Sequence, residues 1–441
     1  MILIDNEGRF RYPEQRVMTN EKMKEFIVKN QEISVRKYFK LGNAYKNKYD
    51  IFRQKKKPAY KPDNRISVNY AKYITDTMNG FFIGIPIKSM SDDEAVQAEV
   101  DMINAYNVIE DKNAEISKMS SIYGRAYEMY YIDESSQLCI APLSPIEAFI
   151  IYSEGIVAKP LYFVRYFKNS DNRTIGSYSD AHDIYYFDAT SELKILETVP
   201  HNFGDVPAVE FIDNNERMGI FESAMPMIDE YNKAISEKAN DVDYFADAYL
   251  KVIGARVDEE DTVNIRSSRI INFETNGENV SVDFMQKPNA DTTQENLINR
   301  LQKDIFITSM VANISDEDFG ASSGVALRYK LQAMSNLAEV KKRKFERSLN
   351  DRYRILFSTP LTPSLANGWA SIRYKFTLNY PANLSEEVDI ASKMTGITSK
   401  ETQLSTISVI DNVHDEMDRI EAEEEAELGG GYELMRTADE Q

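Results

Sequence analysis

Acidic residues are the first candidates for chemistry in this sequence. Asp316, Glu317 and Asp318 are consecutive, and carboxylate oxygens are the ligands that Mg²⁺ prefers in a nuclease site. Adjacent carboxylates point in diverging directions, however, whereas metal sites gather ligands from several elements. The run therefore favours a solvated acidic loop over a metal site, and we predict no metal ion and no other cofactor.

Histidine and cysteine give no stronger candidate. His182, His201 and His414 are far apart and have no partner at metal-ligand spacing, so structural or surface roles are expected. Cys139 is the only cysteine, which excludes an intramolecular disulfide and fits a reducing cytoplasm. The sequence contains no G-x-x-x-x-G-K-[ST] phosphate loop, no H-E-x-x-H and no G-x-S-x-G. We therefore predict no catalytic residue, and we expect that the protein is not an enzyme.

Composition and charge limit the class of protein. The 441 residues are 42% hydrophobic and 28% charged, which predicts a largely folded chain of several substructures. The net charge of −19 argues against a protein that grips nucleic acid over its whole surface, but it permits one that lets DNA slide. No signal peptide and no apolar stretch of membrane-spanning length occur, so a soluble intracellular protein with no membrane partner is expected.

The first half of the chain alternates helical and strand patterns, typical of an α+β fold. A basic linker, Gln54 to Pro62, is expected to be a solvated loop, with phosphate contact as the alternative. Helices are predicted from Asn20, capped by Thr19, and over Val35–Tyr45, Arg65–Gly80 and Asp92–Tyr106. Strands are predicted over Arg125–Ile132, Cys139–Pro142, Ala148–Tyr152, Leu161–Phe167 and His182–Asp188.

The second half contains a small β module between two helices. A long helix is predicted over Phe221–Leu250, and a second begins at the capping-box pair Thr292 and Glu295. Between them, Arg269–Glu274 and Val280–Met285 are predicted to pair as a hairpin. This order, a helix out, a small sheet and a helix back, predicts an organised protrusion.

The acidic loop Asn313–Gly324 precedes a long helix predicted over Val325–Phe357. Lys341, Lys342, Arg343 and Lys344 form a basic patch on that helix, either a solvated or intersubunit ion-pair surface or a phosphate contact. A strand is predicted over Trp369–Leu378, followed by helices over Ser385–Thr395, Lys400–Leu404 and Asp411–Glu427, the last strongly acidic. The Gly-rich tail beyond Gly429 is expected to be disordered.

Three stretches in collinear order resemble the phage portal protein family, in particular portals of siphophages that infect Gram-positive hosts. They are NRISVNYAKYITDTMNGFFIGIPI (from Asn64), ISDEDFGASSGVALRYKL (from Ile314) with KKRKFERSL after it, and SKETQLSTISVIDN (from Ser399). The resemblance covers about residues 20–425. It implies a head–tail connector of a tailed double-stranded DNA bacteriophage, located at the capsid portal vertex of the virion and in the host cytoplasm during assembly.

The resemblance also implies a portal fold with a wing, long stem helices, a small α/β clip, a tunnel loop with a long helix, and a short helical crown. The implied parts are the wing (1–220), stem (221–250), clip (251–290), stem (291–312), tunnel loop (313–324), long helix with the rest of the wing (325–384), and crown with tail (385–441). The residues implied for the DNA channel at the tunnel loop are Asn313, Ser315, Asp316, Glu317, Asp318, Phe319, Gly320, Ser322 and Ser323.

The partners implied by the resemblance are those of a packaging machine. They comprise a homo-oligomeric ring of about twelve subunits, the large terminase that carries the ATPase, head-completion or adaptor proteins, major capsid and scaffolding proteins, and double-stranded DNA that passes without sequence specificity. Two alternatives stay open: a metal-dependent enzyme of nucleic acids, and another structural adaptor of a virion.

Overall fold

The computed structural model describes residues 2–58, 61–246, 250–253, 281–284, 291–315, 324–380, 384–407, 409–410, 413–414 and 416–423. The chain divides into two compact units, each described by itself. Unit 1 comprises Met1–Ala312 and Ala333–Thr377, and unit 2 comprises Asn313–Gln332 and Leu378–Gln441.

A long helical run follows the first two strands of unit 1. The predicted cap at Thr19 is confirmed, because its side chain accepts a hydrogen bond from the Lys22 N–H at the start of α1 (Asn20–Ile33). The two predicted helices are joined without a break, since a π-helical turn (Ser34–Tyr38) connects α1 to α2 (Phe39–Tyr45). The buried face of α1, with Met23, Phe26 and Ile27, covers one face of a large sheet.

That sheet has seven strands in the order β1-β2-β6-β7-β8-β9-β10. Neighbouring strands are antiparallel except β2 and β6, which are parallel. The strands are β1 (Leu3–Ile4), β2 (Phe10–Tyr12), β6 (Ala148–Ser153), β7 (Pro160–Lys168), β8 (Thr174–Ser179), β9 (Asp183–Asp188) and β10 (Lys194–Pro200). Of these, β1, β2, β8 and β10 were not predicted from the sequence.

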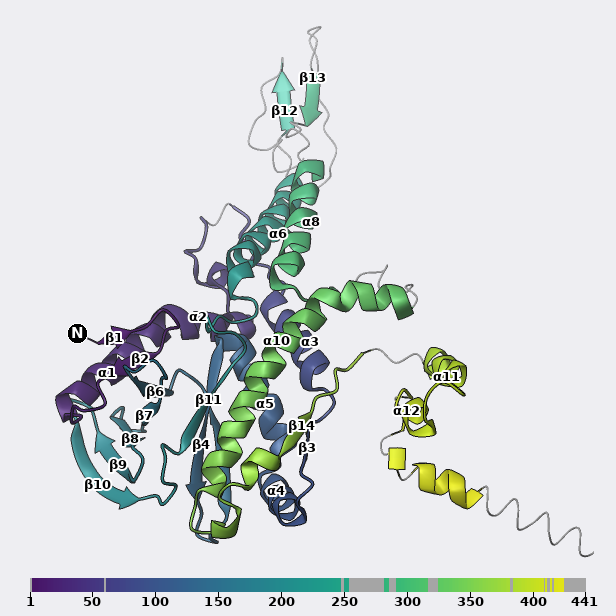
Figure 1. Cartoon of the computed structure of the whole chain (residues 1–441). Helices are drawn as coiled ribbons and strands as arrows, with labels where there is room; N and C mark the ends of the chain where they lie inside the picture. Colours follow the sequence, from purple (N-terminus) through teal and green to yellow (C-terminus); the bar gives the residue numbers. More distant parts are fainter. Residues whose placement is uncertain are drawn as a thin grey trace, which may run out of the picture. The chain divides into compact units, whose positions relative to one another are not determined.

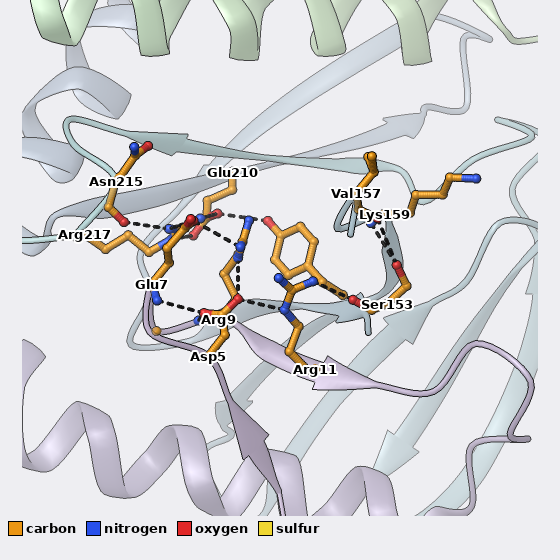
Figure 2. Close-up of polar contacts among 12 residues, drawn as sticks. Asp5, Glu7, Arg9, Arg11, Ser153, Val157, Lys159, Glu210, Asn215 and Arg217 are labelled. Atoms are coloured by element: carbon orange, nitrogen blue, oxygen red, sulfur yellow. Dashed lines mark hydrogen bonds and ion pairs between the residues drawn. The ribbon is translucent and has the colours of Figure 1, made fainter. Parts of the chain in front are cut away.

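The N-terminal hairpin β1–β2 is held on the sheet by charged groups (Figure 2). Arg11 donates to the Ser153 carbonyl at 2.6 Å, and Arg217 binds Glu7 at 3.1 Å. Arg217 also binds the buried Glu210 at 2.7 Å, and the Tyr152 hydroxyl donates to the same carboxylate at 2.9 Å. This network joins the first strands to a region about 200 residues later in the chain.

A second layer of unit 1 combines helices with a three-stranded sheet in the order β11-β4-β5. Its strands are β4 (Arg125–Ile132), β5 (Leu138–Leu143) and β11 (Ala208–Ile212), and its helices are α3 (Tyr70–Ile83), α4 (Glu94–Asn107), α5 (Ile109–Tyr123) and α10 (Gly324–Phe357). The predicted α4 and α10 are confirmed to within two residues at either end. Helix α5 and strand β11 were not predicted.

Two predicted elements in this layer are wrong in extent. The helix predicted from Arg65 begins only at Tyr70, because the preceding residues are extended along another helix. Of the strand predicted over Trp369–Leu378, only β14 (Arg373–Lys375) is present, paired with β3 (Lys88–Met90). Among the described residues, short 3₁₀ turns are Asp50–Arg53, Glu222–Ala224, Pro363–Leu365 and Gly368–Ser371.

The predicted protrusion consists of two helices and a two-stranded sheet. Helices α6 (Met225–Ala246) and α8 (Asp291–Ser309) lie side by side (Figure 1), and β12 (Leu250–Ile253) pairs antiparallel with β13 (Ser281–Phe284). The first helix was predicted to include Leu250, which instead begins β12. The strand predicted over Arg269–Glu274 lies outside the described residues.

Unit 2 contains short helices. The predicted pair is confirmed as α11 (Leu384–Lys393) and α12 (Lys400–Leu404), and residues 416–423 of the predicted acidic helix are helical. The first nine residues of α10 also belong to this unit. The tail predicted to be disordered lies outside the described residues.

Candidate functional site

The base of the protrusion is fixed by aromatic packing on α3. Tyr70 packs edge-to-face on Tyr231 of α6 at 5.0 Å and on Phe306 of α8 at 5.6 Å between ring centroids. Tyr73 contacts the same Phe306 ring at 5.7 Å. Because one tyrosine touches both helices, α6 and α8 emerge from the body at a defined place.

Polar pairs continue the contact between α6 and α8 above this base. Lys238 pairs with Glu295, and Gln294 donates to Asp241 at 2.8 Å. Glu295, predicted as part of a capping box, is therefore used across the two helices. The helices are thus joined by hydrogen bonds and an ion pair as well as by apolar contact.

The other side of α6 binds the extended segment 64–68. The backbone N–H groups of Asn64, Ile66 and Val68 donate to Asn240 Oδ1 at 2.6 Å, Ser236 Oγ at 2.9 Å and Asn232 Oδ1 at 2.8 Å. Two residues of extended chain advance about 6.7 Å, close to the roughly 6 Å between helix positions i and i+4. Every second backbone N–H of the segment therefore binds one polar side chain of α6. We call these three side chains, Asn232, Ser236 and Asn240, the polar ladder.

Sequence reasoning missed the polar ladder, although a signal was present. Asn232, Ser236 and Asn240 recur every four residues on one face of a predicted helix, and all three are buried. Lys238 and Asp241 lie roughly 140–200° around the helix from Ser236 at 100° per residue. Helix α6 is therefore enclosed between the extended segment and α8.

The described residues include only the start of the predicted tunnel loop. Helix α8 ends at Ser309, and Met310 adopts a left-handed conformation (φ 58°) that ends the helix. Beyond it, the Ser315 N–H donates to the side chain of Asn313 at 3.3 Å. Seven predicted site residues lie outside the described residues: Asp316, Glu317, Asp318, Phe319, Gly320, Ser322 and Ser323.

The predicted basic patch on α10 is wrong for Lys341. Its ammonium is buried in unit 1, 3.2 Å from Asp213 Oδ1, 2.6 Å from Ser121 Oγ and 3.0 Å from the Ser117 carbonyl. Burial lowers the pKa of Lys341 below its usual value, and the Asp213 carboxylate opposes that shift. A lysine so enclosed cannot meet a phosphate or a neighbouring subunit, and it joins α10 to α5 instead.

The other three residues of the patch remain at the surface. Lys342 lies 3.8 Å from Glu339 and above the Phe376 ring, Arg343 is exposed, and Lys344 is half-buried. Whether they meet phosphate or a neighbouring copy stays a prediction.

A second buried ion pair on α10 was not predicted. Arg352 forms a two-point contact with Glu128 of β4, at 2.6 and 2.9 Å, and donates to Asn113 of α5 at 2.7 Å. The guanidinium also lies over the Phe211 ring of β11. Lys341 and Arg352, three helical turns apart, thereby fix the position of α10 along the body.

The described residues include potential metal ligands and histidines. Among them, no three His, Cys, Asp or Glu side chains gather as a metal site. His201 accepts a hydrogen bond from the Phe203 N–H and contacts the Asp180 carbonyl at 3.0 Å, and burial lowers its pKa. Within the same described part of the chain, no helix is both long and apolar enough to span a bilayer.

Comparison with family models identifies the family of this chain. The model of the family described as Phage portal protein, SPP1 Gp6-like, matches residues 24–430. The portal protein of Clostridium phage phiCD119 is 25% identical over 411 residues, which cover 84% of this chain and 89% of that relative. Two solved structures are also similar: the neck of an empty gene transfer agent particle (TM-score 0.49, 11% identity) and a native gene transfer agent virion (TM-score 0.45, 12% identity), each covering 76% of this chain and 89% of the other. Because the family model covers most of its length, the chain belongs to the phage portal proteins and is a structural component of a tailed-phage virion.

Proposed function

We propose that this portal chain forms a closed ring of about twelve copies around a channel for double-stranded DNA. The ring occupies one vertex of the capsid, where DNA enters during packaging and leaves during ejection. The observation that carries this proposal is the protrusion α6–β12–β13–α8. It is held by aromatic contacts with α3 and by the hydrogen bonds of the polar ladder with the segment 64–68. An acidic loop and a long helix follow it directly in the sequence. A ring of such chains has a wall of paired helices with acidic loops at one level.

The parts of the chain are assigned to the parts of a portal accordingly. We assign residues 1–220 and 325–384 to the wing and long helix, 221–250 and 291–312 to the stem, 251–290 to the clip, 313–324 to the tunnel loop, and 385–441 to the crown and tail. The observed lengths of α6, α8 and α10, which are 22, 19 and 34 residues, support the stem and long-helix assignments.

The channel guides DNA by repulsion and binds no particular sequence. The chain carries a net charge of −19, and Asp316, Glu317 and Asp318 repeat around the ring at the tunnel loop. Such repulsion fades within about 8–10 Å at physiological salt, so it acts on DNA that approaches the wall. Lys342, Arg343 and Lys344 contact either a DNA phosphate or a neighbouring copy of the chain.

The chain has no catalytic role in this proposal, and the energy for packaging comes from a partner. The large terminase docks on the clip and hydrolyses ATP, and head-completion proteins later replace it. Scaffolding and major capsid proteins contact the wing. The lack of a phosphate loop in the sequence supports this division of labour.

The test is electron microscopy of the purified full chain, with native mass spectrometry beside it. We expect rings of about twelve subunits with a central hole that admits duplex DNA. A chain that stays monomeric or dimeric at high concentration, with or without DNA and magnesium, would contradict the proposal.

A further inference from the structure

Charge is segregated between two surfaces of unit 1. Residues 36–57 contain nine Lys and Arg against one Asp, whereas residues 92–115 contain eight Asp and Glu against one Lys. The first set lies on the helical run through α2 and just beyond it, and the second on α4 and the start of α5. Figure 1 shows α2 near the base of α6 and α4 at the lower edge of unit 1 as drawn.

The basic surface, which we define as Val35, Arg36, Phe39, Lys40 and Lys46, has an apolar centre. Val35 is 67% exposed and Phe39 46% exposed, on consecutive turns of the helical run. Lys40 lies 3.9 Å from Asp229, whereas Arg36 and Lys46 form no ion pair with any described residue. The π-helical turn inserts one extra residue at this place, a distortion that often accompanies functional surfaces.

The acidic surface also has an apolar centre, but the charges around it are negative. We define it as Asp101, Met102, Tyr106, Val108, Glu110 and Asp111. Met102, Tyr106 and Val108 are 48%, 49% and 65% exposed. Among the described residues, Asp101, Glu110 and Asp111 have no ion-pair partner.

Two features of the acidic surface suit it to receive an apolar side chain. Met102 and Tyr106 line a cavity of about 200 Å³ whose apolar wall they share with Leu138 and the half-exposed Leu361, and whose other wall is polar, with Glu99, Gln137 and Thr362. Val108 is held in the left-handed region (φ 48°), where a β-branched residue is strained, and its side chain is exposed.

We propose that the basic surface of one copy of this chain docks on the acidic surface of the next copy. Both surfaces have an apolar centre with unpaired charge at the rim, as protein interfaces do, and the rims are of opposite sign. A two-fold contact of either surface with its own copy would place like charge on like charge, whereas a head-to-tail contact pairs opposite charges and generates a ring when the rotation closes. This inference rests on the proposed ring and names the contact that builds it, with Phe39 entering the cavity beside Met102 and Tyr106.

The experiment exchanges the charges in the full-length chain. Arg36→Glu with Lys46→Glu reverses the basic surface, and Asp101→Lys with Asp111→Lys reverses the acidic one. Each pair is expected to raise the protein concentration at half-assembly by about tenfold or more, measured by sedimentation, because like charges then face each other. All four substitutions in one chain restore opposite charges and are expected to return assembly to near the wild-type concentration.

Glu192→Lys with Glu197→Lys is the matched control, since both glutamates are exposed near β10, outside either surface. Circular dichroism and thermal melts of every variant show whether the fold is kept. Rings that form equally well in both reversed variants, or a fourfold variant as defective as the twofold ones, would overturn the proposed contact and leave the ring itself intact. If the wild-type chain forms no rings, the proposed ring is wrong, and the proposed contact is wrong with it.

Discussion

Buried charged side chains determine how distant parts of unit 1 are held together. Lys341 joins α10 to Asp213, Arg352 joins it to Glu128, and Glu210 binds Arg217 beside the N-terminal hairpin. Breaking a buried pair by removing one partner leaves an uncompensated charge, which typically costs about 3–5 kcal/mol. We therefore assign these charged residues to stabilising the fold and not to contacting DNA.

Lys341→Met tests this assignment. The variant leaves Asp213 buried without its cation, so we expect the free energy of unfolding to fall by about 3–5 kcal/mol, measured by urea denaturation. Adding Asp213→Asn is expected to recover part of the loss. Arg343→Met, two positions along the same helix but exposed, is the control and should change stability by no more than about 0.5 kcal/mol. Equal stability of the Lys341 and Arg343 variants would contradict a structural role for Lys341.

Glu210 predicts how stability depends on pH. Burial alone would raise the pKa of Glu210, but Arg217 and Arg125 outweigh it and hold the pKa at about 2, below the usual 4.5. The unfolded chain therefore binds a proton first as the pH falls, so Glu210 stabilises the fold fully above pH 4.5 and loses this contribution as the pH approaches 2. We expect Glu210→Gln to be less stable at neutral pH and to show a shallower loss of stability in this range. A parallel pH profile for the variant and the wild type would contradict the prediction.

Among the elements, the polar ladder on α6 is the most specific device for positioning the protrusion. Ser236→Ala removes both the acceptor for the Ile66 N–H and the donor to the Ile66 carbonyl, at 2.9 and 3.0 Å. We expect a loss of about 1–2 kcal/mol and faster hydrogen exchange in the peptide that contains Ile66 and Val68. Lys233→Ala, on the exposed face of the same helix, should leave exchange in that peptide unchanged.

Helices with clear local signals could be predicted from the sequence. The cap at Thr19 fixes the start of α1, and the apolar stripe of α10 predicts Val325–Phe357 against an observed Gly324–Phe357. The order of helix, small sheet and helix was likewise visible, because periodicity and turn residues are properties of a few neighbouring positions.

Elements held by tertiary contacts could not be predicted in the same way. The buried face of α5 contains Asn113, Ser117, Ser120 and Ser121, so it has no continuous apolar stripe. The side chains of Asn113, Ser120 and Ser121 bind Arg352, Asp213 and Lys341, which are far away in the sequence. Lys341 itself lies in a run of four basic residues, and nothing local distinguishes the one that is buried. The candidate channel residues were proposed from a family resemblance, and most of them lie outside the described residues.

At the scale of the whole assembly, negative charge at the tunnel loop predicts how DNA is retained. The variant with Asp316→Asn, Glu317→Gln and Asp318→Asn removes three charges per copy, or about 36 from a ring of twelve. If the loops position DNA and resist its slippage, capsids built with this variant should retain less packaged DNA, measured as the length protected from nuclease.

The matched control removes the same charge elsewhere. Asp418→Asn, Glu421→Gln and Glu423→Gln neutralise three exposed acids of the helical residues 416–423 and should leave retention unchanged. Packaging and retention at wild-type levels in the tunnel-loop variant would contradict the role of the acidic loop.

The N-terminal hairpin has a consequence for the order in which the protein is made. Strand β2 needs β6 as its neighbour, and the charged network of the hairpin is complete only when Arg217 has been synthesised. At about 5–20 residues per second, the ribosome adds the intervening 200 or so residues in roughly 10–40 s. Strand β6 begins about 140 residues after β2, so β2 lacks this neighbour for roughly 7–28 s, and the hairpin lacks Arg217 for the longer time. Chaperones that bind nascent chains can act on this end of the molecule during that interval.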